Sequence, residues 1–537
     1  MEMVTNLVKN GNRMERLLPF HADNFELTLN IQCKPHHTAC FSIKPYGNSV
    51  SIAGSSGVEL AAGVHHFLKA HCNSSFFWDA TGGNQLDIAC LSAAHDESSR
   101  LARSASFNAA PATDAPNTAT VPPNNAVGES RGRSVPHFYY QNVVTSSYSF
   151  AWWDWPRWEA EVDWRALHGI NLAFTGQEYI WQKTWIDDQA DLQRRIVARM
   201  RSFGMNPVFP AFAGFVPEAL VRRFPHARFT RSANWNHFPD QYCCVHLLDP
   251  LDPLFHEIRS AFLQAQREEW GPSRIGYYAA DTDEAFWKPA QIKSLLSGVP
   301  RGRLILVDLF AEVVPQWKRT NALDGVPAIW CMLHNFGGNT DMSLGPRGFA
   351  VEAVAQGPFD AMHGSGIAGP SHLVGVGICP EGIEQNPVIY DLMSEWAFRD
   401  MPIPLQALLG LAGTTRTTLC SYSERDAQSL QVAGQALLQL LADLDDLLAT
   451  NRGFLLGPRL EAAKARAHAA EEAALYERNL RTQFSWGTSD RADTALHDYA
   501  NLEWAGLISS YYMPRWQAWL QRLRADLAGQ PSMQPLG

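Results

Sequence analysis

The chain has 537 residues, of which 46% are hydrophobic and 18% are charged. This composition excludes an intrinsically disordered protein and indicates a globular one of about three domains. The 44 Lys and Arg residues against 54 Asp and Glu residues give a formal net charge of −10, which makes nucleic acid and anionic membranes poor partners. No apolar run reaches the roughly 18 residues of a membrane span, and residues 1–20 lack the apolar core of a secretory signal peptide.

Residues 24–91 mix short alternating segments with turns. Segments 25–29 and 49–52 alternate apolar and polar residues as strands do, and 58–68 has helical spacing. We therefore predict a small α+β domain over 24–91. Residues 92–134 are rich in Ala, Ser, Pro and Asn, and we expect a flexible linker there because such a segment buries too little apolar surface to order itself.

From residue 135 the pattern changes to apolar, strand-like runs separated by helix-length amphipathic stretches, the best of which is 188–203. Strands that alternate with helices indicate a parallel sheet. We predict an α/β fold, a (β/α)₈ barrel over 135–399 that is one strand short, and the alternative is a doubly wound sheet, although no Gly-rich phosphate loop follows any run. The runs are 137–144, 169–174, 206–212, 274–280, 303–309, 326–332 and 371–378.

After residue 400 the strand-like runs stop, and we predict an all-helical domain over 400–537. Residues 428–449 and 457–480 have helical spacing or helix-favouring composition. A further helix is expected around Trp504 and Tyr512, reaching Pro514.

The nine cysteines are scattered and form no CxxC pair, so the sequence supports neither a zinc site nor a redox motif. Several, such as Cys331 and Cys379, lie in or beside apolar runs. Free cysteine packs there as a small apolar side chain, and we therefore expect mostly buried free thiols.

Polar residues follow several of the runs in the barrel segment. Glu178, Glu284, His334 and Glu381 each come just after a run, where a barrel places its reactive groups. Paired carboxyl groups at a barrel mouth suit glycoside hydrolysis. A barrel enzyme of another class would need a metal cluster or a phosphate loop, and the sequence has neither pattern.

The aromatic segment 148–158 follows the first run and contains Trp152, Trp155 and Trp158 at steps of three. The rings could form a wall on which a sugar stacks, or they could pack the first helix onto the barrel. A three-residue step places side chains on one helix face, and this favours packing.

Several blocks make the chain recognisable. It resembles the alpha-N-acetylglucosaminidases, a family of glycoside hydrolases that includes the lysosomal enzymes, and the match runs from about residue 24 to residue 525 in the family's order. The blocks are YYQNV at 139–143, SYSF at 147–150, WWDW at 152–155, GINLA at 169–173, GQE at 176–178, RSFGM at 201–205, PAFAG at 210–214, WCMLHNFGG at 330–338, PEGI at 380–383 and DYAN at 498–501.

The resemblance implies a small α+β domain, a catalytic (β/α)₈ barrel and a helical C-terminal domain. It implies removal of terminal α-linked N-acetylglucosamine from glycans such as heparan sulfate, with retention of configuration and without metal or cofactor, and a lysosomal or secreted location. The family's nucleophile corresponds to Glu381, and its acid/base to Glu284. Matching sugar-contact positions are Asn142, Tyr148, Gln177, Glu178, His334, Asn335, Trp504 and Tyr512. The sequence does not decide whether the chain forms a homo-oligomer.

The chain departs from the family pattern at Val144, where the family has Cys, and lacks two internal segments, between Gln182 and Leu192 and after Thr282. The second would carry the eighth strand, so we expect an unpaired gap in the barrel and weak or absent activity. Glu284 either is the acid/base or belongs to the far side of the missing segment. The alternative function is therefore an inactive or sugar-binding relative, and a gene-model or splice error competes with a truly shortened protein.

Overall fold

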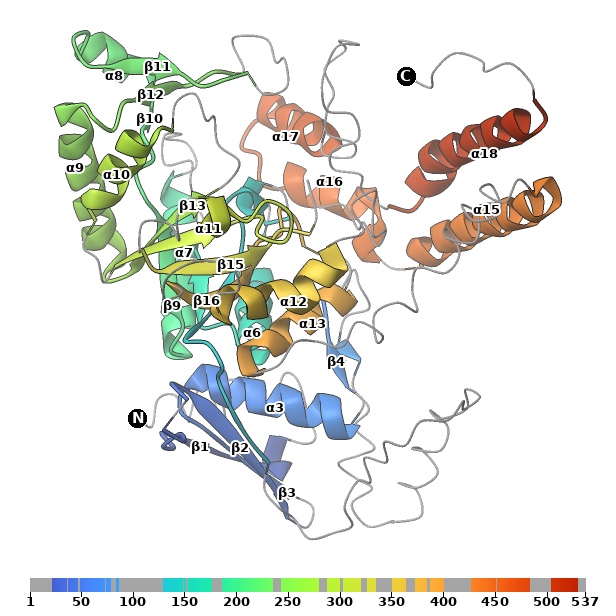
Figure 1. Cartoon of the computed structure of the whole chain (residues 1–537), viewed down its shortest axis with the longest axis horizontal. Coiled ribbons are helices and arrows are strands. Elements are labelled where there is room, and N and C mark those ends of the chain that lie inside the picture. Colours follow the sequence, from blue (N-terminus) through green and yellow to red (C-terminus); the bar gives the residue numbers. More distant parts are fainter. Residues whose placement is uncertain are drawn as a thin grey trace.

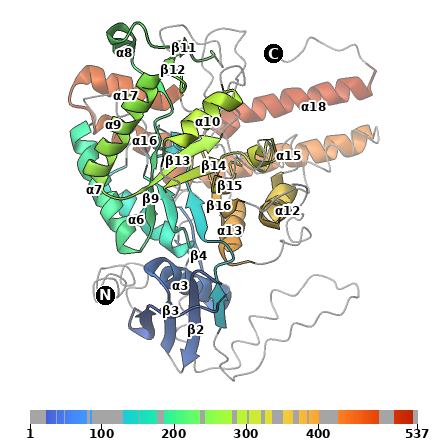
Figure 2. The ribbon, with the colours of Figure 1, turned by 60° about the vertical axis from the view of Figure 1, so that its left-hand side comes forward.

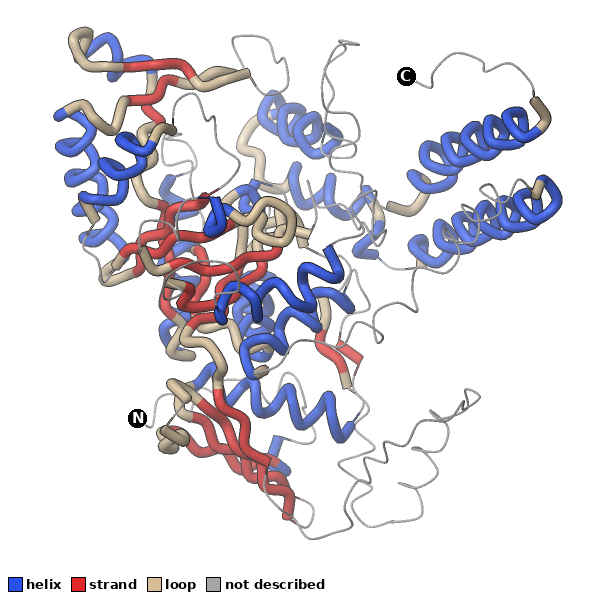
Figure 3. The backbone as a smooth tube through the Cα atoms, viewed as in Figure 1, coloured by secondary structure: helices blue, strands red, loops and turns tan. Residues whose placement is uncertain are grey.

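The computed structural model of the chain has three parts (Figure 1). A sheet with a covering helix is followed by a barrel and then by C-terminal helices. Figure 3 distinguishes the strands of the sheet and barrel from the helices around them. The structure describes residues 22–35, 37–46, 49–72, 74–78, 84–85, 129–147, 149–150, 153–175, 186–234, 243–279, 287–299, 303–319, 326–334, 350–363, 372–383, 387–399, 426–450, 452–482 and 504–529.

The first part is a four-stranded sheet in the order β1-β3-β2-β6 with helix α3 packed on it. The sheet buries every second residue of β3, as the alternating sequence predicts. The predicted strands and helix are present here. Their bounds are β1 Phe25–Leu29, β2 Cys40–Tyr46, β3 Ser49–Gly54, α3 Gly57–Cys72 and β6 Glu129–Gly132, and short elements nearby are η1 Ala22–Asn24, β4 Ser75–Phe76 and β5 Asn84–Gln85.

Strand β6 lies within the segment 92–134 that we expected to be a linker. It pairs antiparallel with β2, from Cys40↔Gly132 to Ile43↔Glu129. The expectation is wrong at this end because backbone pairing orders the strand although it carries few apolar side chains. Residues 92–128 lie outside the described residues, and the predicted domain bounds stay predictions.

The second part is a closed, all-parallel barrel of seven strands among the described residues, in the order β7-β8-β9-β13-β14-β15-β16 (Figure 2). Each predicted run contains one strand, so the α/β-barrel prediction is confirmed. The strands are β7 His137–Tyr140, β8 Leu172–Phe174, β9 Asn206–Pro210, β13 Arg274–Ala279, β14 Leu304–Asp308, β15 Ala328–Met332 and β16 Leu373–Ile378.

The expected gap in the barrel is absent. It should fall between β13 and β14, where the eighth strand is missing, but these two strands pair directly from Ile275↔Leu304 to Ala279↔Asp308. Our expectation was wrong because two extended runs of matching length can satisfy each other's backbone groups, so no open edge remains.

Helices follow the strands on the outside of the barrel. An excursion of short strands and α8 Glu218–Arg223 separates β9 from α9. The predicted helix 188–203 is α7. The bounds are α6 Trp155–Leu167, α7 Ile186–Ser202, α9 Pro253–Trp270, α10 Pro289–Ser297, α11 Gln316–Arg319, α12 Ala350–His363, α13 Pro387–Glu395 and η7 Trp396–Phe398, and the excursion contains β10 Phe215–Val216, β11 Phe229–Arg231 and β12 His246–Leu248.

The third part is helical, as predicted, and α15 and α18 lie side by side in Figures 1 and 2. The predicted helix 457–480 is two helices, broken between Lys464 and Ala470. Trp504 precedes the last helix, which continues past Pro514 instead of ending there. The elements are α15 Ala427–Ala449, η10 Arg452–Phe454, α16 Leu456–Lys464, α17 Ala470–Thr482, the π-helical turn η11 Ile508–Tyr512 and α18 Met513–Leu527. No described helix is long and apolar enough to cross a membrane.

The cysteine prediction is largely wrong. Cys33 is bonded to Cys40 and Cys243 to Cys244, and Cys72 is also disulfide-bonded. Cys40 and Cys72 are buried beside apolar residues and are nevertheless disulfide-bonded, so a place in an apolar run does not by itself indicate a free thiol. Cys331 and Cys379 are buried free thiols, as expected.

Candidate active site

Three predicted site residues follow neighbouring barrel strands at their C-terminal ends. Asn142 comes two residues after β7, His334 two residues after β15, and Glu381 three residues after β16. Strand β16 pairs with both β7 and β15, so the three loops leave the barrel side by side. This is the face on which α/β barrels carry their active sites.

The loop of Glu381 is tied to the segment after β7 on both sides. Asn142 Nδ2 donates to the carbonyl oxygen of Cys379 at 3.2 Å, and Thr145 Oγ1 donates to that of Pro380 at 2.6 Å. On the far side, the backbone N–H of Ile383 donates to Ser149 Oγ at 2.8 Å. Glu381 is partly buried, and these anchors restrict the backbone that positions its carboxylate.

Asn142 is also held by the turn that follows it. Its Oδ1 accepts the backbone N–H of Val144 at 3.1 Å, so Val144, where the family has Cys, begins the short helical turn Val144–Ser147. The neighbouring Gln141 side chain accepts a hydrogen bond from Arg165 Nη2. Arg165 is fully buried and also pairs with Glu161 at 3.4 Å. A buried polar network therefore supports the first loop from below.

His334 has a left-handed backbone, with φ 59°, which is uncommon for a residue other than glycine. Glu312 Oε1 stabilises this turn by accepting the backbone N–H groups of Leu333 and His334, both at 2.7 Å. The His334 ring makes an edge contact with Tyr390 of α13, with centroids 6.1 Å apart. Burial lowers the pKa of His334 to about 4, so its ring is neutral at pH 5–8.

Two buried carboxyl groups lie under this turn. Asp308 ends β14 and is fully buried, and Glu312 follows it at 6% exposure. Burial raises the pKa of Asp308 to about 7 and that of Glu312 to about 8. Asp308 Oδ2 accepts the N–H of Trp317 at 3.0 Å, whereas Asp308 Oδ1 and Glu312 Oε2 have no hydrogen-bond partner among the described residues.

The sequence shows Asp308 inside a run and Glu312 after it, among the polar groups at the strand ends, but we assigned neither a role in the predicted site. The sequence marked Asp308 as unusual, because a carboxyl group inside an otherwise apolar run is rarely found in a buried strand. Buried carboxyl groups with shifted pKa values gather at functional sites.

The described aromatic rings after β7 pack against one another. Phe150 and Trp158 are each 4% exposed, and their centroids lie 4.8 Å apart. Trp153 contacts both, at 4.4 Å from Phe150 and 5.5 Å from Trp158. Packing of α6 onto the barrel therefore accounts for these rings, as the spacing favours, while Trp152 lies outside the described residues.

The remaining predicted site residues divide into two groups. Trp504 is buried under the guanidinium of Arg459, 5.0 Å from the ring centroid, and Tyr512 contacts Tyr511 at 5.1 Å. Both contacts lie within the C-terminal part of the chain. Glu284, Tyr148, Gln177, Glu178 and Asn335 lie outside the described residues.

Family models match all three parts of the chain. The alpha-N-acetylglucosaminidase (NAGLU) N-terminal domain matches residues 12–90, the tim-barrel domain matches 138–187, 182–285 and 279–400, and the C-terminal domain matches 403–535. These matches follow the order of parts expected from the sequence blocks.

Individual relatives agree with the family models. The chain is 32% identical to human alpha-N-acetylglucosaminidase over 661 aligned residues, which cover 89% of this chain and 82% of the human one. Its fold is similar to a family 89 glycoside hydrolase from Clostridium perfringens in complex with PUGNAc, with TM-score 0.67, 20% identity and coverage of 100% of this chain and 76% of that one. A form of that bacterial enzyme with two Glu→Gln substitutions, in complex with its substrate GlcNAc-alpha-1,4-galactose, gives TM-score 0.68 at 19% identity, with the same coverage. The chain therefore belongs to the alpha-N-acetylglucosaminidase family of glycoside hydrolases.

Proposed function

We propose that the chain removes terminal α-linked N-acetylglucosamine from glycans with retention of configuration. The observation that carries the proposal is the anchored Glu381 loop at the C-terminal face of the barrel, tied by Asn142 and Thr145. The 32% identity to human alpha-N-acetylglucosaminidase supports the substrate class. The direct pairing of β13 and β14 removes one reason for expecting an inactive chain, the open gap in the barrel.

The proposed reaction has two steps. The Glu381 carboxylate attacks the anomeric carbon while Glu284 gives its proton to the departing glycosidic oxygen. Glu284, now a carboxylate, takes a proton from water, and the resulting attack on the anomeric carbon releases the sugar and frees Glu381. The anchors around Glu381 hold the nucleophile in place, which matters because small displacements reduce rate steeply.

The proposed sugar contacts are made by loops around this carboxylate. Asn142 follows β7 and His334 follows β15, the two strands that flank β16. Their side chains therefore come from the loops on either side of the Glu381 loop. Tyr148, Gln177, Glu178, Asn335, Trp504 and Tyr512 complete the proposed contact set. Amide and imidazole groups suit the hydroxyl and N-acetyl groups of the sugar because each can donate or accept a hydrogen bond.

We further propose a glycan such as heparan sulfate as substrate and a lysosomal or secreted location. The disulfide Cys33–Cys40 supports an oxidising compartment during folding. The raised pKa values of Asp308 and Glu312 keep both groups protonated in acid, which avoids two buried negative charges beneath the site at lysosomal pH.

Hydrolysis of aryl α-N-acetylglucosaminides tests this proposal. Glu381→Ala should abolish turnover, while Glu268→Ala, which changes an exposed glutamate on α9, should match the unmodified chain. Wild-type turnover by Glu381→Ala would refute the nucleophile assignment.

The acid/base assignment needs its own comparison. Glu284→Ala should lose most activity on a substrate with a poor leaving group and retain much more on one with a good leaving group, because the latter needs no protonation. Added azide should then accept the glycosyl group and restore turnover. Equal losses on both substrates, without rescue, would remove Glu284 from the mechanism.

A further inference from the structure

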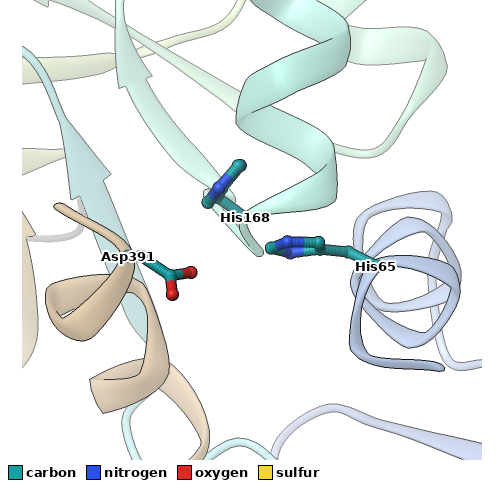
Figure 4. Close-up of side chains that lie close together, drawn as sticks. All are labelled: His65, His168 and Asp391. Atoms are coloured by element: carbon teal, nitrogen blue, oxygen red, sulfur yellow. The ribbon is translucent and has the colours of Figure 1, made fainter. Parts of the chain in front are cut away.

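A buried cluster of potential metal ligands lies where the N-terminal helix meets the barrel. His65 comes from α3, His168 follows the end of α6, and Asp391 comes from α13 (Figure 4). One ligand atom from each residue lies within 4.8 Å of the others. The two imidazoles are 7% and 3% exposed, and Figure 4 shows the three side chains converging from three separate elements.

Each ring has a backbone carbonyl oxygen beside its Nδ1, and the two rings lie against each other with centroids 4.5 Å apart. His65 Nδ1 lies 3.1 Å from the carbonyl oxygen of Leu167, and His168 Nδ1 lies 2.9 Å from that of Trp164. A carbonyl oxygen only accepts hydrogen bonds, so each Nδ1 carries a proton, and Nε2 is the ring nitrogen that can offer a lone pair to a metal. Metal-binding histidines are commonly held in this way by a backbone carbonyl on the other nitrogen.

Asp391 brings the negative charge of the cluster. Its Oδ2 accepts a hydrogen bond from Lys69 Nζ, which also bonds Glu395 Oε1 at 2.9 Å. Lys69 thus lies between two carboxylates and engages one oxygen of Asp391, and the other oxygen, Oδ1, is the candidate ligand atom. The Lys69–Glu395 contact orients the carboxylate from behind.

We propose that His65, His168 and Asp391 bind a Zn²⁺ ion that joins the N-terminal domain to the barrel. Two imidazole nitrogens and a carboxylate oxygen form a donor set that suits Zn²⁺, with a fourth position for water. His168 lies in the turn that leads into β8, at the N-terminal end of the barrel strands. That end of an α/β barrel contributes stability, whereas catalysis occurs at the opposite end, so the role of the ion is structural.

Zinc content and zinc affinity of the full chain test the proposal. The chain produced with Zn²⁺ and then dialysed should hold a metal ion that chelator removes, with a fall in Tm that added Zn²⁺ reverses. His168→Asn and Asp391→Asn should each weaken Zn²⁺ binding by more than about 100-fold, since losing a ligand should exceed the 10–100-fold effect of losing a supporting contact. Co²⁺ in place of Zn²⁺ should give the visible absorption of a four-coordinate site, absent from both variants.

Glu395→Gln is the matched control, because it changes the same ion-pair network without removing a ligand. It should keep Zn²⁺ binding within about 100-fold of the unmodified chain. Circular dichroism shows whether each variant folds. Because the two substitutions lie in different elements, the test stands if one of the variants fails to fold. Folded chain without stoichiometric zinc affinity, or zinc retained equally by His168→Asn and Asp391→Asn, would overturn the proposal.

Discussion

Glu312 shows how one buried carboxylate can shape the mouth of the barrel. Its Oε1 accepts two consecutive backbone N–H groups, those of Leu333 and His334, and His334 has φ 59°. A left-handed residue other than glycine costs on the order of 1 kcal/mol, while hydrogen bonds between uncharged groups contribute about 0.5–1.5 kcal/mol each. The pair of bonds therefore outweighs the backbone cost and keeps His334 beside Glu381.

Removing this acceptor should disturb both stability and catalysis. Glu312→Ala leaves two buried N–H groups unpaired and should lower the free energy of unfolding by about 2–4 kcal/mol. Glu312→Gln keeps one acceptor oxygen and should lose less stability. If the turn positions a sugar contact, both variants should raise KM more than they lower kcat on an aryl glycoside. An Ala variant with unchanged stability and kinetics would show that Glu312 positions nothing.

The buried acids also give a pH dependence of stability. The pKa values of Asp308 and Glu312 in the folded chain are about 7 and 8, above those of the unfolded chain, about 4. The folded chain therefore binds more protons between pH 4 and 8, so this contribution to stability is largest in acid and is lost as pH rises through 7 and 8. We expect Tm to fall from pH 6.5 to pH 8.5, and Asp308→Asn with Glu312→Gln to flatten that fall.

His334 changes the pH dependence of stability in the opposite direction, and this sets the pH range over which the carboxyl groups are tested. Its folded pKa of about 4 lies below the unfolded value of about 6.5, so its contribution is fully present above pH 6.5 and is lost as pH falls toward 4. Measuring Tm only above pH 6.5 isolates the carboxyl groups. A Tm that rises over this range in the unmodified chain, and equally in the double variant, would contradict the raised pKa values.

At the residue scale, the sequence predicted the positions that the structure groups at one face. Glu381 and His334 could be found because they follow apolar runs, whereas Asn142, inside the run 137–144, was found only through the resemblance to the family. The hydrogen bonds that hold the Glu381 loop could not be predicted from the sequence. Thr145 and Ser149 make them across more than 230 residues of chain.

At the scale of elements, β16 depends on a glycine that allows close packing. A Cβ atom at Gly377 would lie 2.7 Å from Cys331 Sγ and 2.8 Å from Tyr139 Cβ. These two residues belong to the flanking strands β15 and β7 and face the barrel interior. The strands β15 and β7 can therefore pack this closely on β16, the strand that leads to Glu381, only because residue 377 has no side chain.

Gly377→Ala should lower the free energy of unfolding by about 1–3 kcal/mol, the usual cost of an overpacked core. Gly457→Ala is the matched control, because Gly457 lies in α16 with nothing within 4 Å of its added Cβ; it should be neutral or stabilising by up to about 1 kcal/mol. Chemical denaturation measures both. Equal effects of the two substitutions would refute the close-packing account.

Element type was predictable from period and length, because seven apolar runs and their intervening helices follow strong local patterns. Two features depended on tertiary contacts that local pattern does not report. The direct β13–β14 pairing replaces the expected gap, and β6 is ordered by β2 although its own composition favours a linker.

At the scale of the whole molecule, a buried ion pair helps to join the N-terminal sheet to the barrel. Arg133 and Glu59 are 1% and 2% exposed. Arg133 donates to Glu59 Oε1 at 2.7 Å and to the carbonyl oxygen of Gly169 at 2.6 Å. Glu59 lies on α3 and Gly169 on the turn before β8, so one guanidinium connects both domains.

Breaking this pair should be costly, whereas replacing both partners should not. Glu59→Ala leaves a buried guanidinium without its carboxylate and should cost about 3–5 kcal/mol of unfolding free energy. Glu59→Leu combined with Arg133→Met should recover part of that loss, because no buried charge is left unpaired. Chemical denaturation of both variants measures the two losses, and a double variant less stable than Glu59→Ala would contradict this interpretation.

The order of the three parts was visible in the sequence, but their connections were not. The Arg133–Glu59 pair joins residues 74 positions apart that no local pattern relates. The fold prediction succeeded because it rested on local patterns, whereas such contacts between distant segments could not be predicted.

The anomeric form of the first sugar released from an aryl α-N-acetylglucosaminide tests the central claim most directly. Proton NMR of the fresh reaction distinguishes the two anomers before they equilibrate. We predict that the unmodified chain first releases the α anomer and that Glu381→Ala releases no sugar. Release of the β anomer first, or no hydrolysis by the folded unmodified chain, would contradict the account.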